Sequence, residues 1–153
     1  MSRTWIMVDV ETSGPIIGHH SLTELGAVAG SRSDGIVDRF AALIAPIGDA
    51  VKTSRDSFAR AKVSGEPPAT AMRRFADWCK RFDRPTFIAR PAAFDWPWIV
   101  QYAWAHLGEN PFGFKAVCAS SWFEARGKRF EVELPHVAVD DADLQLRHFL
   151  ANG

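Results

Sequence analysis

The sequence has little of what would make it a disulfide-stabilised, strongly basic or membrane-embedded protein. Its two cysteines, Cys79 and Cys118, lie far apart in apolar contexts, so we expect buried free thiols rather than disulfides. The formal net charge is +0, which excludes the overall basic field of a tight duplex-DNA binder. A local patch or bound metal ions could still carry a nucleic-acid contact. With no signal peptide and no apolar run near about eighteen residues, we expect no membrane contact and a cytoplasmic location.

The remaining composition is that of an ordinary globular protein, with 47% hydrophobic and 24% charged residues. A length of 153 residues predicts a single domain spanning residues 1–153. Six tryptophans and eleven phenylalanines are many for this length, and we expect most of them in the core. For Trp96, Trp98 and Trp104 the alternative to core packing is a dimer interface, so a homodimer is possible.

The first third of the chain predicts three consecutive strands. An apolar, β-branched run begins at Trp5 and ends at two carboxylates before Thr12-Ser13-Gly14-Pro15 breaks it. Residues 21–29 and 36–44 predict the second and third strands, and Asp34-Gly35 between them indicates a tight turn. Short connections favour an antiparallel meander.

The rest of the chain alternates helices with strands. Together with the meander, this predicts an α/β fold with a mixed five-stranded sheet, in which strands 1, 2 and 3 are antiparallel, strands 4 and 5 are parallel, and helices flank the sheet. We expect Asp95, followed by Pro97, to start a helix that Gly108 closes. The expected segments are helices 54–63, 70–82, 120–125 and 137–151, strands 86–89 and 114–119, and a charged loop at 126–133.

Two carboxylates at the end of the first strand suggest a metal site. Asp9 and Glu11 are two residues apart, so on a strand they point to the same face. Like charges on one face of a buried strand repel each other, and a divalent cation would relieve that repulsion. The alternative is a solvated strand end without a ligand.

Two later segments could bring further groups to this point. Asp95 precedes a proline, which also suits an ordinary helix N-cap. His136 and Asp141 are five residues apart, which does not place them on one helix face. They can converge if His136 lies on the loop entering the last helix and Asp141 in its first turns. The alternative for this pair is an ordinary surface contact.

Taken in order, Asp9-x-Glu11, Phe94-Asp95 and His136-x4-Asp141 resemble the motifs of the DEDD 3′–5′ exonuclease superfamily, in its histidine (DEDDh) branch. That branch includes proofreading subunits, ribonuclease T and oligoribonuclease-like enzymes. Thr12-Ser13-Gly14 resembles the family's T-x-G, and residues 23–28 resemble its second strand. The resemblance runs from Ile6 to Leu150. One departure is Arg90-Pro91, where members of the family often carry His-Asn.

The resemblance implies a ribonuclease H-like fold and release of nucleoside 5′-monophosphates from single-stranded DNA or RNA 3′ ends, or from short oligonucleotides. It implies two divalent cations, Mg²⁺ or Mn²⁺, with Asp9 bridging both. Glu11 and Asp141 would complete the more tightly held ion, and Asp95 would act on the second. His136 would be the general base and not a ligand.

Substrate contacts also follow from the resemblance. The backbone of Thr12, Ser13 and Gly14 would contact the 3′-hydroxyl, whereas Leu22 and Phe94 would pack on the terminal bases or simply in the core. The basic run Arg126, Lys128 and Arg129 could contact phosphate or lie in a solvated loop. The rival to an enzyme is a catalytically silent nucleic-acid-binding or protein-interaction module of the same fold. The sequence does not distinguish DNA from RNA.

Overall fold

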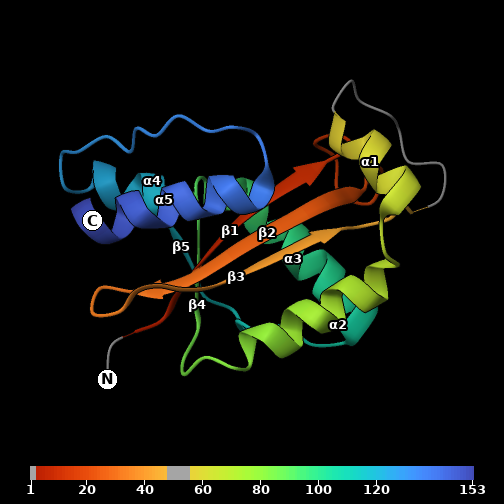
Figure 1. Ribbon diagram of the computed structural model, residues 1–153, viewed down its shortest axis with the longest axis horizontal. Coiled ribbons are helices and arrows are strands. Elements are labelled where there is room, and N and C mark those ends of the chain that lie inside the picture. Colours follow the sequence, from red (N-terminus) through yellow and green to blue (C-terminus); the bar gives the residue numbers. More distant parts are fainter. Residues whose placement is uncertain (1–2, 48–55) are drawn as a thin grey trace.

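A five-stranded sheet with the spatial order β3-β2-β1-β4-β5 forms the centre of the molecule (Figure 1). The computed structural model describes residues 3–47 and 56–153. Strand β1 (Trp5–Thr12) pairs antiparallel with β2 (Leu22–Ser31), which pairs antiparallel with β3 (Gly35–Leu43). On its other side β1 pairs parallel with β4 (Thr86–Ala89), which pairs parallel with β5 (Ala116–Cys118). The predicted mixed sheet is confirmed.

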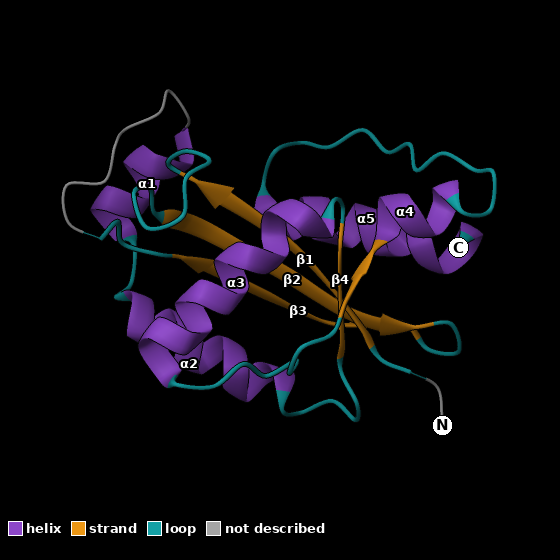
Figure 2. Cartoon of the chain, turned by 180° about the vertical axis from the view of Figure 1, so that it is seen from behind, coloured by secondary structure: helices purple, strands orange, loops and turns teal. Residues whose placement is uncertain are grey.

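Helices cover both faces of the sheet. One face carries α4 (Ala119–Glu124) and α5 (Ala138–Asn152). The other face, seen in Figure 2, carries α2 (Pro68–Cys79) and α3 (Ala92–Leu107), while α1 (Asp56–Ser64) lies at one end of the meander. Among the described residues no helix combines the length and apolarity needed to cross a bilayer.

The expected start of the third helix was wrong. Helix α3 begins at Ala92, so Asp95 lies in its first turn rather than at its N-cap, and Pro97 lies inside the helix. Because Pro97 has no N–H, the carbonyl of Ala93, four residues earlier, lacks the helical hydrogen bond that another residue at this position would donate. Gly108 ends the helix in the left-handed conformation, as predicted. Of the helix expected over 54–63, residues 54–55 lie outside the described residues.

The alternation of side chains along β1 separates two cores. Ile6, Val8 and Val10 are buried in the cluster that also includes residues of α2 and α3. Trp5 and Met7 point the other way, into the cluster formed with α5. Asp9 and Glu11 continue that second row. The strand therefore presents both carboxylates on the face covered by α5.

A glycine on β2 lets α5 approach the sheet at the level of Asp9. Gly26 pairs with Asp9 across the β1–β2 ladder. A Cβ at Gly26 would lie 2.2 Å from the carbonyl carbon of Ala138, in the first turn of α5. Nearby, the buried Glu24 accepts a hydrogen bond from the Ala138 backbone N–H at 3.3 Å. Its other carboxylate oxygen forms an ion pair with Arg60 of α1 at 2.7 Å. The start of α5 is thus fixed against β2.

The tryptophan cluster divides between core and surface. Trp98 is 1% exposed and belongs to the core, whereas Trp104 on the same helix is 49% exposed. Core packing is therefore correct for Trp98 and wrong for Trp104, while Trp96 is partly buried against the same core. A homodimer through Trp104 stays a prediction.

Substituting Gly26 tests the close approach of α5. Gly26→Ala should lower the free energy of unfolding by about 1–3 kcal/mol, the usual cost of overpacking, because the new methyl group meets backbone atoms that cannot rotate away. Urea unfolding measures this. The control is Ala41→Val, since Ala41 is paired with Gly26 on β3 but exposed. Equal stability of Gly26→Ala and wild type would contradict the packing described.

Candidate active site

Four carboxylates from three separate segments meet at the carboxyl-terminal end of β1. Asp9 and Glu11 come from β1, Asp95 from the first turn of α3, and Asp141 from the first turn of α5. All four line one cavity of about 400 Å³. The other residues lining this acidic pocket are Val10, Thr12, Gly14, Pro15, Arg90, Pro91, Phe94, Leu134 and His136.

Asp95 reaches the site because β4 stops early. The β1–β4 pairing ends at Met7, so Val10 has no ladder partner on that side of β1. Its backbone N–H instead donates to Asp95 Oδ1 at 3.0 Å. Asp95 thereby satisfies a buried backbone donor, and the same bond places its carboxylate beside β1.

The loop before α5 presents His136 to Asp141. The backbone N–H of His136 donates to Asp141 Oδ1 at 3.1 Å, and His136 has a φ of 61°, in the left-handed region. Such strain in a non-glycine residue is typical of functional sites. One ligand atom from each of Glu11, His136 and Asp141 lies within 4.8 Å of the other two. The His136 side chain is exposed and Asp141 is buried.

Burial, with repulsion between carboxylates as a smaller cause, shifts three of the carboxyl groups toward their protonated forms. Burial raises the pKa of Asp9 to about 8, with further increases from Asp95, Asp141 and Glu11. Burial likewise raises the pKa of Asp95 to about 7, which the Val10 N–H partly offsets. The pKa of Asp141 is also raised, chiefly by burial. A cation among these groups would favour their ionised forms.

Gln145 belongs to the site although the sequence analysis did not identify it. It lies one helical turn after Asp141, is fully buried, and donates from Nε2 to Asp9 Oδ1 at 3.1 Å. Its Oε1 has no hydrogen-bond partner among the described residues. The i, i+4 spacing from Asp141 was the available signal, because it places Gln145 on the same helix face.

The predicted substrate-binding residues separate into two groups. Thr12, Gly14 and Phe94 line the acidic pocket, and Phe94 is 38% exposed. Leu22 is fully buried in the core, so a base contact by its side chain is not supported. Ser13 is also fully buried, and both its Oγ and its N–H bond to the backbone of Ser21. Ser13 thus closes the loop and leaves no free backbone donor for a substrate.

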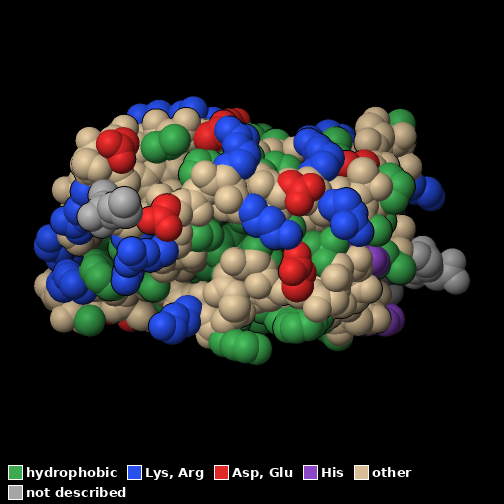
Figure 3. Space-filling view, turned by 90° about the horizontal axis from the view of Figure 1, so that it is seen from below, with side chains coloured by type: hydrophobic (Ala, Val, Ile, Leu, Met, Phe, Trp, Pro, Cys, Tyr) green, Lys and Arg blue, Asp and Glu red, His purple; other side chains and the backbone are tan. Residues whose placement is uncertain are grey.

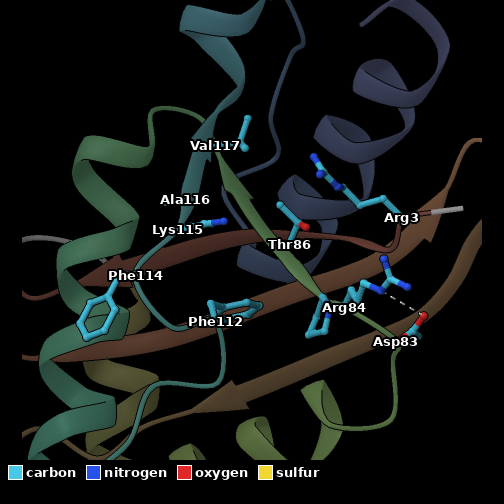
Figure 4. Close-up of a pocket in the computed structure, with 10 residues that line it drawn as sticks. Arg3, Asp83, Arg84, Thr86, Phe112, Phe114, Lys115, Ala116 and Val117 are labelled. Atoms are coloured by element: carbon cyan, nitrogen blue, oxygen red, sulfur yellow. Dashed lines mark ion pairs between the residues drawn. The ribbon is translucent and has the colours of Figure 1, made fainter.

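A larger cavity, of about 740 Å³, opens at the opposite ends of the parallel strands (Figure 4). It contains Arg3, Arg84 and Lys115 but a single carboxylate, Asp83, which pairs with Arg84. It lacks the group of acids that defines the smaller pocket. Figure 3 shows acidic and basic side chains intermixed over much of one face of the molecule, in keeping with the balanced net charge.

The chain was compared with known proteins. No family model matches it. The 3′–5′ DNA exonuclease Cap18 of Escherichia coli is 32% identical in an alignment of 128 residues that covers 78% of this chain and 67% of Cap18. The chain belongs to the DEDDh family of 3′–5′ exonucleases. This DEDDh protein also has the ribonuclease H-like fold of solved nucleases.

Two of those structures illustrate the shared fold. E. coli exonuclease I in complex with a 5cy-dT13 oligonucleotide matches with a TM-score of 0.77 and 11% identity, over 97% of this chain and 40% of that one. The nuclease domain of 3′hExo, a DEDDh family member bound to rAMP, matches with a TM-score of 0.63 and 12% identity, over 98% and 91%. The chain therefore spans about two fifths of exonuclease I.

The raised pKa values predict how the metal-free protein responds to pH. Unfolded aspartate has a pKa near 3.8, so between about pH 4 and pH 8 the folded chain holds protons at Asp9 and Asp95 that the unfolded chain has lost. These groups should therefore lower the free energy of unfolding as pH rises through that range. In Asp9→Asn, the free energy of unfolding should fall less steeply with rising pH than in wild type. At pH 8 the variant should therefore be more stable than wild type. Thermal unfolding in chelator at pH 5 and pH 8 measures both effects.

The matched control is Asp77→Asn, at an exposed position on α2. It should leave the pH dependence of the melting temperature unchanged. If Asp9→Asn behaves like this control, the electrostatic crowding at Asp9 is absent.

Proposed function

We propose that this DEDDh protein hydrolyses single-stranded nucleic acid from its 3′ end and releases nucleoside 5′-monophosphates. The observation that carries the proposal is the convergence of four carboxylates and His136 at one pocket. DNA is the favoured substrate, because the E. coli relative is named a DNA exonuclease. The proposal treats residues 1–153 as one catalytic domain.

The donor set fits two Mg²⁺ or Mn²⁺ ions. Carboxylate oxygens are the ligands these ions prefer. The pKa of Asp9 is raised first by burial and then by the neighbouring carboxylates, and a bound cation would favour its ionised form. Asp9, Glu11, Asp95 and Asp141 would hold the ions. When bound, they supply charge neutralisation at the phosphate and activation of the attacking water. The hydrogen bonds from Val10, His136 and Gln145 orient three of these carboxylates in advance.

His136 is the proposed general base. Its side chain is exposed at the pocket, where a ring nitrogen can take a proton from the attacking water and pass it to solvent. Its closeness to Glu11 and Asp141 also suits a metal ligand. The base role is favoured because Mg²⁺ selects oxygen over imidazole nitrogen.

Residues at the pocket wall would hold the terminal nucleotide. The partly exposed ring of Phe94 offers a surface for stacking against a base. The backbone of Thr12 and Gly14 lines the same cavity and would contact the 3′-hydroxyl. That contact would select chain ends over internal positions.

A catalytically silent binding module of the same fold is the alternative. It would need neither the complete set of acids nor the strained backbone of His136. Both features therefore favour the enzyme.

Incubation of 5′-labelled single-stranded DNA with Mg²⁺ tests the proposed activity. We expect stepwise shortening from the 3′ end, release of mononucleotides and complete loss of activity in chelator, because the acids alone cannot neutralise the phosphate. Matched RNA should be degraded more slowly. Asp141→Asn is the control for contaminating nucleases. Binding of the strand without chelator-sensitive shortening would favour the silent module.

His136→Ala separates the base from a ligand. Loss of a general base should lower kcat by about 10²–10⁴-fold. Mn²⁺ affinity, measured by calorimetry on the metal-free protein, should stay nearly unchanged, whereas Asp9→Asn should weaken it strongly. A parallel loss of Mn²⁺ affinity in His136→Ala would show that the imidazole is a ligand.

A further inference from the structure

Arg90 is the one Lys or Arg among the described residues that line the acidic pocket. It follows the last residue of β4 and precedes Pro91, at the position where the sequence departs from the family's usual His-Asn. The side chain is half-buried. A single cation beside four carboxylates is expected to pair with one of them unless another role keeps it apart.

The guanidinium of Arg90 is positioned by an aromatic ring rather than by an acid. Its Cζ lies 5.1 Å from the ring centroid of Phe130, a buried residue that packs against Phe123. Within the part of the chain that the structure describes, the Arg90 guanidinium forms no hydrogen bond and no ion pair with another side chain or with the backbone. This cation–π contact holds the guanidinium at the rim of the pocket and leaves its N–H donors available for a bidentate acceptor such as a phosphate.

Arg90 also lies where the acidic pocket meets two shallow hollows on the neighbouring surface. It lines a hollow of about 380 Å³ with Glu131 and Glu133, and another of about 350 Å³ with Glu124 and Arg129. In the first hollow, Glu131 and Glu133 would repel a phosphodiester chain that continued far from the pocket. In the second hollow, the charge of Arg129 is offset by Glu131, with which it pairs at 3.9 Å, and by Glu124. A contact at Arg90 is therefore confined to a phosphate close to the strand's 3′ end.

We propose that Arg90 is a substrate-binding residue that holds a backbone phosphate within the last few nucleotides of the strand. The inference rests on the proposed nuclease function. In it, the Arg90 guanidinium attracts the negatively charged strand to a pocket that otherwise contains four carboxylates. Nearby basic residues are less suited to this role. Arg126 donates to the carbonyl oxygen of Trp122, and Lys128 donates to that of Asn152.

Arg90→Gln tests the proposal through binding and kinetics together. In a His136→Ala background, the Kd for a labelled oligothymidylate should rise about tenfold, as for loss of a charged hydrogen bond. The slope of log Kd against log salt concentration should fall by about 0.7, the value for one single-strand phosphate contact. With His136 intact, KM should rise about as much as Kd while kcat changes little.

Two further variants distinguish phosphate binding from a structural role. Arg126→Gln is matched, because Arg126 also lies over an aromatic ring, with Cζ 4.0 Å from the Trp122 centroid, but does not line the acidic pocket. It should leave Kd, KM and the salt slope unchanged. Arg90→Lys keeps the charge without the planar fork, so it should retain the salt slope with intermediate affinity.

The result can overturn the proposal in a defined way. If wild type shortens the strand but Arg90→Gln keeps the wild-type Kd and salt slope, Arg90 does not hold a phosphate. If Arg90→Gln lowers both the affinity for the strand and the melting temperature, and Arg90→Lys restores neither, the role of Arg90 is structural. If wild type neither binds nor shortens the strand, the proposed function itself fails.

Discussion

The repulsion among four carboxylates at one end of β1 is the constraint on which the other features of the site depend. The fold holds Asp9, Glu11, Asp95 and Asp141 around one cavity even though burial raises the pKa values of Asp9, Asp95 and Asp141. Repulsion from the other carboxylates of the set adds to this at Asp9 and Asp95. Packing elsewhere must offset this cost. The close contact of α5 with Gly26 and the two cores on either side of β1 provide that packing.

Each of three carboxylates is oriented by one N–H donor of the chain. Asp95 accepts from the Val10 backbone, Asp141 from the His136 backbone and Asp9 from the Gln145 amide. These bonds favour the ionised carboxylate and fix its direction. Each bond therefore joins two parts of the chain that must be correctly placed for the site to form. Two of the bonds link distant segments, and the third links the loop before α5 to its first turn. The short length of β4 contributes to this arrangement. The β1–β4 pairing ends at Met7, which leaves the Val10 N–H free to donate to Asp95.

Local patterns made much of this arrangement predictable. The apolar run before Asp9 and Glu11 predicted β1 and the shared face of the two acids, since alternation on a strand is a local property. The sheet order followed from short turns between the first strands and helices between the later ones. Asp95 was misplaced because Pro97 suggested a helix start, whereas α3 begins at Ala92, directly after the extended residue Pro91.

Long-range contacts account for what the sequence did not reveal. Gln145 bonds to Asp9 across 136 residues, and Glu24 holds the start of α5 across 114. No local pattern encodes these partners. Leu22 begins β2 with its side chain in the core, a direction that depends on the register bulge between Glu11 and Thr12. The pattern of residues could not fix that register.

A neutral protein that acts on a polyanion must obtain its attraction locally. With a formal net charge of +0, long-range steering of a nucleic-acid strand is weak. Cations bound to the four carboxylates would make the pocket attractive to phosphate, so the attraction would be confined to the proposed site of hydrolysis. Arg90, fixed by Phe130 and flanked by Glu131 and Glu133, would extend that attraction by one phosphate and no further. Such a charge distribution would favour strand ends over long internal stretches, because a chain passing beyond Arg90 would meet Glu131 and Glu133, and there Arg129 is paired with Glu131.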